Sequence, residues 1–136
     1  MENTLFALLL HNRPHPLELL QHALNPLPVQ TASVRTCAEL KRLIPKALPY
    51  IIFCDTILPD GTWEDVVKLA DRAPAPVNVI VVGANDDMKL YVSVLEGGAF
   101  DFIVPPFEAQ SLEFVVTSAA RNASLRRKTQ AFAAAS

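Results

Sequence analysis

The chain has 136 residues, of which 51% are hydrophobic and 19% charged, with a formal net charge of −2 at pH 7. This composition excludes a disordered or fibrous protein and predicts one globular domain with its own core. The apolar runs stop well short of the roughly 20 residues of a membrane span, and the first residues lack the basic region of a secretory signal, so we expect a cytoplasmic protein without membrane contact.

Five short apolar runs predict β-strands, at residues 5–10, 29–34, 50–54, 78–82 and 101–104. Residues 5–10 are almost continuously apolar, whereas residues 29–34 form a weaker and more polar run. Continuous rather than alternating apolarity is typical of strands that are covered on both faces. Helix-like segments lie between them, and this alternation is the pattern of βα units around a parallel sheet. The sequence therefore predicts an α/β protein in three layers, with a five-stranded sheet in the middle.

Polar residues and glycines mark where the helices begin and end. Thr36 and Glu39 form a capping-box pattern, and Thr62 with Asp65 resembles it. Gly97-Gly98 predicts the end of the fourth helix. Within that helix, Leu90, Val94 and Leu95 have core spacing, whereas Lys89 and Tyr91 are expected to face outward.

Three residues with reactive or bulky side chains are expected to serve packing. Cys37 and Cys54 are too few and too isolated to suggest a metal site or a redox pair, so we interpret them as small apolar residues. Trp63 is interpreted as a core anchor of the third helix, with a partly exposed contact residue as the alternative.

The last predicted helix begins near Glu108 and becomes basic, since residues 1–120 carry a formal charge of −6 and residues 121–136 one of +4. The basic residues are Arg121, Arg126, Arg127 and Lys128. Four charges on a terminal helix indicate a solvated face or a linker junction rather than a nucleic-acid site. The acidic body also opposes binding to phosphates, so we expect no direct contact of this domain with nucleic acid.

Several motifs lie where the predicted strands end. Residues 55–61 place Asp55 at a strand end, with Pro59 and Gly61 four and six positions later. Val82-Gly83-Ala84, Gly98-Ala99, Phe102 and Pro105-Pro106-Phe107 follow in order. Together these motifs resemble the receiver domain of bacterial two-component response regulators over about residues 4–125.

The resemblance implies a flavodoxin-like (βα)5 fold with strand order 2-1-3-4-5. Residues 1–125 would form the receiver domain, and residues 126–136 a C-terminal helix extension or linker. Such a domain is a signalling module of a phosphorelay and not an enzyme.

Aspartyl phosphorylation requires a carboxylate nucleophile, Mg²⁺ held by further carboxylates, and a hydroxyl and an ammonium group near the product. By resemblance, Asp55 is the phosphoacceptor; the alternative is an Asp that caps the following loop. The family's acidic pair falls on His11 and Asn12, its hydroxyl residue on Gly83 and its lysine on Pro105. We therefore expect no Mg²⁺, or weak binding through Asp55, and no other cofactor.

Three more residues take their meaning from the resemblance. Phe102 matches an aromatic residue that changes rotamer on phosphorylation, but without a hydroxyl partner it is more simply a packing residue. Pro106 matches a proline that typically follows a cis peptide bond. His11 is either a solvated loop residue or, as an imidazolium, a partial substitute for the missing positive charges beside Asp55.

The leading hypothesis is a receiver with a degenerate phosphorylation site that acts through the surface of its fourth helix, fifth strand and fifth helix. Its partner would be a histidine kinase, an output domain or a second copy. The alternative is a conventional switch that a histidine kinase phosphorylates on Asp55. A flavodoxin-like enzyme or ligand-binding domain is disfavoured, because residues 11–14 form no glycine-rich phosphate loop.

Overall fold

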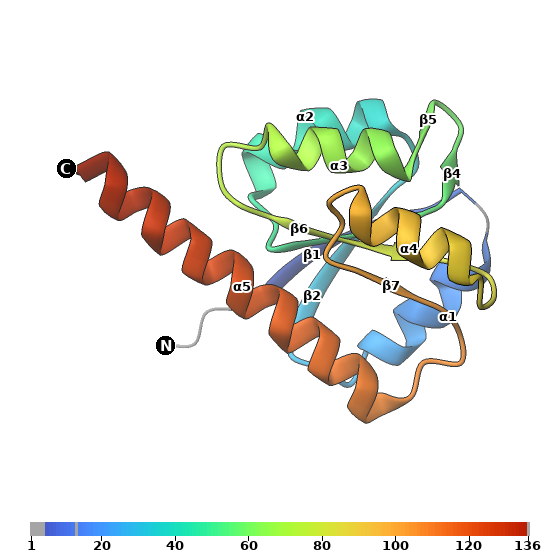
Figure 1. The fold of residues 1–136 in the computed structure, drawn as a ribbon. Helices are drawn as coiled ribbons and strands as arrows, with labels where there is room; N and C mark the ends of the chain where they lie inside the picture. Colours follow the sequence, from blue (N-terminus) through green and yellow to red (C-terminus); the bar gives the residue numbers. More distant parts are fainter. Residues whose placement is uncertain (1–4, 13, 136) are drawn as a thin grey trace.

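The computed structural model describes residues 5–12 and 14–135 and is built around a five-stranded parallel sheet (Figure 1). The strands are β1 (Leu5–Leu10), β2 (Val29–Val34), β3 (Ile51–Asp55), β6 (Asn78–Val82) and β7 (Asp101–Ile103). Their order in space is β2-β1-β3-β6-β7, which is 2-1-3-4-5 when only these five strands are counted. The predicted sheet and its topology are confirmed.

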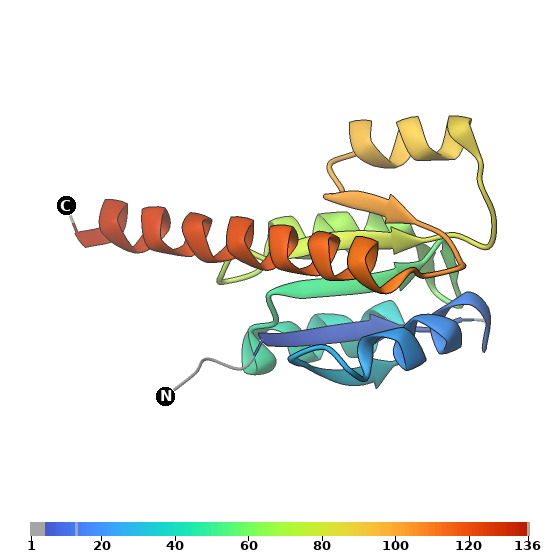
Figure 2. The same ribbon diagram turned by 90° about the horizontal axis from the view of Figure 1, so that it is seen from below.

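Helices cover both faces of the sheet (Figures 1 and 2). They are α1 (Pro14–Leu24), α2 (Cys37–Ala47), α3 (Trp63–Asp71), α4 (Met88–Glu96) and α5 (Ala109–Ala135). Core residues of α2, α3 and α4 pack on one face, and those of α1 and α5 on the other. Alternate residues of each central strand enter the two cores, as Ile52 and Phe53 do in β3. The three-layer architecture is confirmed.

The predicted helix ends are present in the structure. The Thr36 hydroxyl accepts the N–H of Glu39 at 3.1 Å, and the Glu39 carboxylate accepts the N–H of Arg35, one residue before the cap, at 3.1 Å. The helix α4 ends at Glu96, and Gly98 has a φ of +102°, which residues with a side chain rarely adopt.

The assignment of packing residues is correct with one exception. Trp63 is buried in the core beneath α3, and Cys37 and Cys54 are buried as well. Val94 is the fully buried residue of α4, but Leu95 is 37% exposed, so its placement in the core was wrong. The reason is that α4 packs on β7, a three-residue strand at the edge of the sheet, which covers only one row of the helix.

The helix α5 is 27 residues long, and its C-terminal end projects beyond the sheet in both ribbon views (Figures 1 and 2). Of the two forms expected for residues 126–136, the helical extension is the one that the structure has as far as Ala135. Within the described residues, no helix is both long enough and apolar enough to cross a membrane.

Arg127 ties the extension to the body of the domain. Its guanidinium group donates to the carbonyl oxygens of Pro76 at 2.9 Å, Leu48 at 3.1 Å and Pro49 at 2.6 Å. Its carbon Cζ also lies 3.9 Å from the ring centroid of Tyr50. One side chain thus joins the loops that lead into β3 and β6.

Arg126 makes a second anchor one residue earlier. Its Nη1 donates to Oδ1 of Asn78 at 2.9 Å, and Asn78 in turn donates to the carbonyl of Ala119 and to Asn122 of α5. The amide of Asn78 is buried, and these contacts satisfy both its donor and its acceptor. Arg126 is nevertheless exposed, as expected of a solvated face, whereas Arg127 is partly buried and its guanidinium group is directed at backbone carbonyls, so the expectation is wrong for Arg127.

We expect Arg127→Ala to lower the free energy of unfolding by about 2 kcal/mol, because it removes charged hydrogen bonds to three carbonyls and a cation–π contact. Urea denaturation followed through Trp63 fluorescence measures this. Lys128→Ala removes an exposed charge from the neighbouring position and should cost less than about 0.5 kcal/mol. Equal losses in the two variants would contradict the anchoring role.

Candidate functional site

The candidate site lies at the edge where the carboxyl ends of the parallel strands meet, which is where ligands bind in open α/β sheets. Asp55 is the last residue of β3, and its exposed fraction is 0%. Its Oδ1 accepts the backbone N–H of Thr56 at 2.7 Å, and the Thr56 hydroxyl lies at 3.5 Å. The carboxylate is therefore buried and held by the start of its own loop.

The strand register brings the other predicted positions to the same edge. Leu10 pairs with Cys54, so His11 follows β1 beside Asp55. Val82 pairs with Asp55, so Gly83 follows β6 on the other side. The N–H of Gly83 donates to the carbonyl of Ile103 at 2.9 Å, which continues the ladder with β7.

His11 is subject to opposing influences at this edge. Its Nε2 is 3.0 Å from the hydroxyl of Ser33. Burial and, secondarily, the nearby Arg35 lower the pKa of the imidazole below its ordinary value, while Asp55 and Glu18 act in the opposite direction. The charge of Asp55 thus acts on the ring as the hypothesised ion pair requires, but burial and Arg35 outweigh it.

The residues present do not fit a magnesium ion. Mg²⁺ prefers oxygen ligands and near-octahedral geometry, and of the positions that resemble the family's acidic set only Asp55 carries a carboxylate. His11 offers a nitrogen and Asn12 a neutral, exposed amide. Across residues 5–12 and 14–135, no group of three or more His, Cys, Asp or Glu side chains is arranged to hold a metal ion. Arg13, from the same loop, lies outside the described residues.

Gly83 lies directly against the ring of Phe102. A Cβ atom added to Gly83 would lie 2.5 Å from Cζ and 2.8 Å from Cε1 of the Phe102 ring. That ring is 8% exposed and belongs to the core on the α2–α4 face. It meets Tyr91 of α4 edge to face, with ring centroids 6.3 Å apart.

The Pro105–Pro106 peptide bond is cis, in the turn between β7 and α5. Pro105 offers neither a charge nor a backbone N–H in that turn. The edge therefore lacks a cation at the position that resembles the family's lysine.

Asp60 is a residue whose role the sequence did not reveal. It lies in the turn between two short antiparallel strands that were not predicted, β4 (Ile57–Leu58) and β5 (Gly61–Thr62). Its carboxylate accepts the N–H groups of Cys37 at 2.8 Å and Ala38 at 3.1 Å, the first residues of α2. The N–H of Cys37 lowers the pKa of Asp60 below its ordinary value. Asp-Gly after Pro indicates only a turn, and the partner lies 23 residues away.

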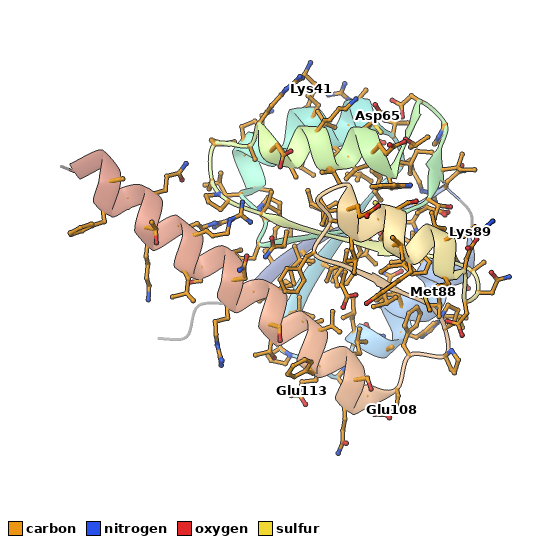
Figure 3. The ribbon with its side chains drawn as sticks, in the orientation of Figure 1. Lys41, Asp65, Met88, Lys89, Glu108 and Glu113 are labelled. Carbon is orange, nitrogen blue, oxygen red and sulfur yellow. The ribbon has the colours of Figure 1, made fainter. Side chains whose placement is uncertain are left out.

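The surface beside the site carries exposed apolar side chains along α4. Met88 is 74% exposed, and Tyr91, Val92 and Leu95 are exposed as well. Figure 3 shows Met88 and Lys89 at the start of this helix and Glu108 and Glu113 at the start of α5. A depression of about 430 Å³ lies between the start of α4 and β7. Its lining residues are Asp86, Asp87, Met88, Tyr91, Phe102 and Val104.

Comparison with known proteins places this geometry in a family. The model of the response regulator receiver domain matches residues 7–117. The response regulator protein PilR of Pseudomonas aeruginosa is 28% identical over 115 residues, covering 85% of this chain and 26% of PilR. The regulatory protein LuxO of Vibrio cholerae is 31% identical over 101 residues, covering 74% of this chain and 22% of LuxO.

Among solved structures, NtrX from Brucella abortus superposes with a TM-score of 0.79 at 20% identity, covering 96% of this chain and 29% of NtrX. The fold and the ordered motifs define a signalling module of two-component systems. The chain belongs to the response regulator receiver domain family. It spans about a quarter of the length of the curated relatives it matches.

We expect Asp60→Asn to lower the melting temperature at pH 7, because it removes a charge and an acceptor from the positive end of α2. The lowered pKa of Asp60 means that its stabilisation is present above the ordinary carboxyl pKa of about 3.9 and is lost as the pH falls through the lower, folded-state value. The difference from the wild type should therefore shrink below about pH 4. Thermal melts between pH 2 and 7 measure it.

The matched control for Asp60 is Glu113→Gln, which removes an exposed carboxylate from the first turns of α5. It should change the melting temperature little at any pH. A difference between Asp60→Asn and the wild type that is constant down to pH 2 would contradict the role of the Asp60 charge.

We expect the pKa of His11 to fall in Asp55→Asn, since the lost negative charge favours the imidazolium, and to rise in Arg35→Gln, since the lost positive charge opposes it. An NMR titration of the imidazole resonances measures both shifts. His22, which is exposed on α1, serves as the internal reference. A His11 pKa that does not move in Asp55→Asn would show that the two groups are uncoupled.

Proposed function

We propose that this receiver domain acts by presenting the surface of α4, β7 and α5 to a protein partner, without requiring phosphorylation of Asp55. The observation that carries the proposal is the set of residues that lie at the carboxyl ends of the strands. Asp55 is fully buried there, and its neighbours at the functional positions are an imidazole, an amide, a glycine and a proline.

The charge balance of the edge supports this proposal. A phosphoryl group would bring a charge of about −1.5 to −2 into the site. A metal ion, an ammonium group and a hydroxyl would have to stabilise it. Pro105 has no charge, Gly83 has no side chain, and burial lowers the pKa of His11, which disfavours its cationic form. At these described positions, an acyl phosphate on Asp55 would therefore find neither the ammonium group nor the hydroxyl that would stabilise it.

The apolar row on α4 supports a protein as the partner. Exposed Met and aromatic side chains next to a depression are typical of protein interfaces. Because PilR and LuxO are about four times as long as the matched segment, an output domain of a longer protein is one such partner. A histidine kinase and a second copy of the domain are the others.

A conventional phosphorylation switch is the second candidate. It is favoured by one observation, since Asp55 stands at the end of β3 in a motif that resembles the family's phosphoacceptor motif. Family membership, in contrast, gives no support to the flavodoxin-like enzyme that the layered fold alone would have allowed.

The two candidates are separated by an amide NMR titration with Mg²⁺ and then beryllofluoride, which mimics a phosphoryl group. We expect no Asp55-dependent shifts in the wild type at millimolar concentrations of both. Asp55→Ala is the negative control. Shifts that require Asp55 and spread to Gly83 and α4 would establish the conventional switch instead.

A positive control is available in His11→Asp/Asn12→Asp, which restores two carboxylates beside Asp55. Two further oxygen ligands should raise the affinity for Mg²⁺. We expect shifts in the loop after β3 at millimolar Mg²⁺ in this variant and not in the wild type. Equal responses in the two proteins would mean that the missing acidic pair does not limit metal binding.

A further inference from the structure

The space beside Gly83 is filled by the ring of Phe102. The two ring atoms that face Gly83, Cζ and Cε1, lie 2.5 and 2.8 Å from the place where a Cβ would be. Real Cβ atoms do not approach other heavy atoms at such distances. The present position of the ring is therefore compatible with glycine at position 83 and with no other residue.

The backbone leaves this contact little freedom to relax. Val81 pairs with Phe102 and Val82 with Ile103 in the parallel ladder. The N–H of Gly83 donates to the carbonyl of Ile103 at 2.9 Å. Gly83 and Phe102 are thus held side by side by main-chain hydrogen bonds, and a side chain at position 83 must displace the ring or break the ladder.

The same ring supports the exposed face of α4. Tyr91 meets Phe102 edge to face at 6.3 Å and an interplanar angle of 66°. Tyr91 and Met88 belong to the row of exposed apolar residues on α4, and both line the depression that also contains Phe102. Contacts therefore run without interruption from Gly83 through Phe102 and Tyr91 to that row.

We propose that Gly83 and Phe102 form a steric lock, in which the absence of a side chain at position 83 keeps the Phe102 ring turned into the core and holds α4 in one arrangement. The exposed row of α4 is then preformed, whatever happens at Asp55. The regulatory meaning of the lock rests on the proposed function, because it concerns the same surface, whereas the steric contact is independent of it.

The lock is tested by a double-mutant cycle. Gly83→Ala should lower the melting temperature by about 5 °C or more through overpacking. In the Phe102→Leu background, which lacks Cζ and Cε1, the same substitution should lower it by less than about 2 °C. A variant Gly83→Ala that does not fold, together with a double variant that does, also supports the lock. Equal effects of Gly83→Ala in the two backgrounds would overturn it.

Gly97→Ala is the matched control. A Cβ at Gly97 would lie 2.6 Å from Cη2 of Trp63, so this substitution crowds an aromatic ring to a similar degree at the other end of α4. Its effect on the melting temperature should be the same with Phe102 and with Leu at position 102. Rescue of Gly97→Ala by Phe102→Leu would show that the coupling is not specific to Gly83, and would overturn the proposal.

The wild-type protein provides a test without substitutions. Met88 is one of two methionines, so ¹³C-methyl labelling of methionine gives a signal from the exposed row of α4. We expect a nuclear Overhauser contact between the Phe102 ring and the Gly83 α-protons that persists with Mg²⁺ and beryllofluoride, and a Met88 methyl signal that does not move. Loss of that contact together with a shift of Met88 would overturn the lock.

The proposed function and the lock fail in different ways. Asp55-dependent shifts confined to the loop after β3, with the Phe102–Gly83 contact and the Met88 signal unchanged, would show that Asp55 binds the mimic while the lock holds. Additive effects in the mutant cycle, with no response to beryllofluoride, would overturn the lock and leave the proposed function standing.

Discussion

The burial of both faces of the parallel sheet is the constraint on which the rest of the molecule depends. Because helices cover both faces, the central strands β1, β3 and β6 consist almost wholly of buried apolar residues. The buried polar side chains, Asp55 and Asn78, lie where strands end and begin. The carboxyl edge holds Asp55 and the loops around it, whereas the amino edge receives the C-terminal part of α5. The site and the anchor of the extension therefore lie at opposite ends of the same strands.

This arrangement gives the C-terminal extension a defined direction. Arg127 joins the carbonyl groups that precede β3 and β6, and Arg126 reaches Asn78 at the start of β6. The helix is thus held at the sheet by two adjacent residues and continues beyond them as helix as far as Ala135. In a longer protein, a following segment would start in the direction set by the axis of α5. The contacts of Arg126 and Arg127 set this direction, and the residues around Asp55 take no part in them.

The sequence predicted what local patterns encode. Continuous apolar runs located the five strands, and residues such as Thr36, Asp65 and Gly98 located helix ends, since caps act within three or four residues. Ordered motifs at the strand ends then placed Asp55 and Gly83 at one edge. The parts that it did not predict depend on partners far along the chain. Asp60 caps a helix that begins 23 residues before it, and Arg127 binds backbone carbonyls, which any residue could supply.

Leu95 illustrates a different limit. Its spacing from Val94 and Leu90 fits a helix stripe that faces a core, and the spacing alone cannot tell how wide the core is. The neighbouring strand β7 has three residues and lies at the sheet edge, so only Val94 is fully covered. The row of apolar side chains on α4 is thus exposed because β7 is too short to cover the whole apolar face of the helix.

The residues at the carboxyl edge differ from the pattern that the motifs of this chain resemble. That pattern has carboxylates where this chain has His11 and Asn12, a hydroxyl where it has Gly83 and an ammonium group where it has Pro105. The Phe102 ring occupies the space where a side chain at position 83 would lie. At this edge the structure thus shows an apolar packing contact between Gly83 and Phe102, next to the buried carboxylate of Asp55, which accepts the N–H of Thr56.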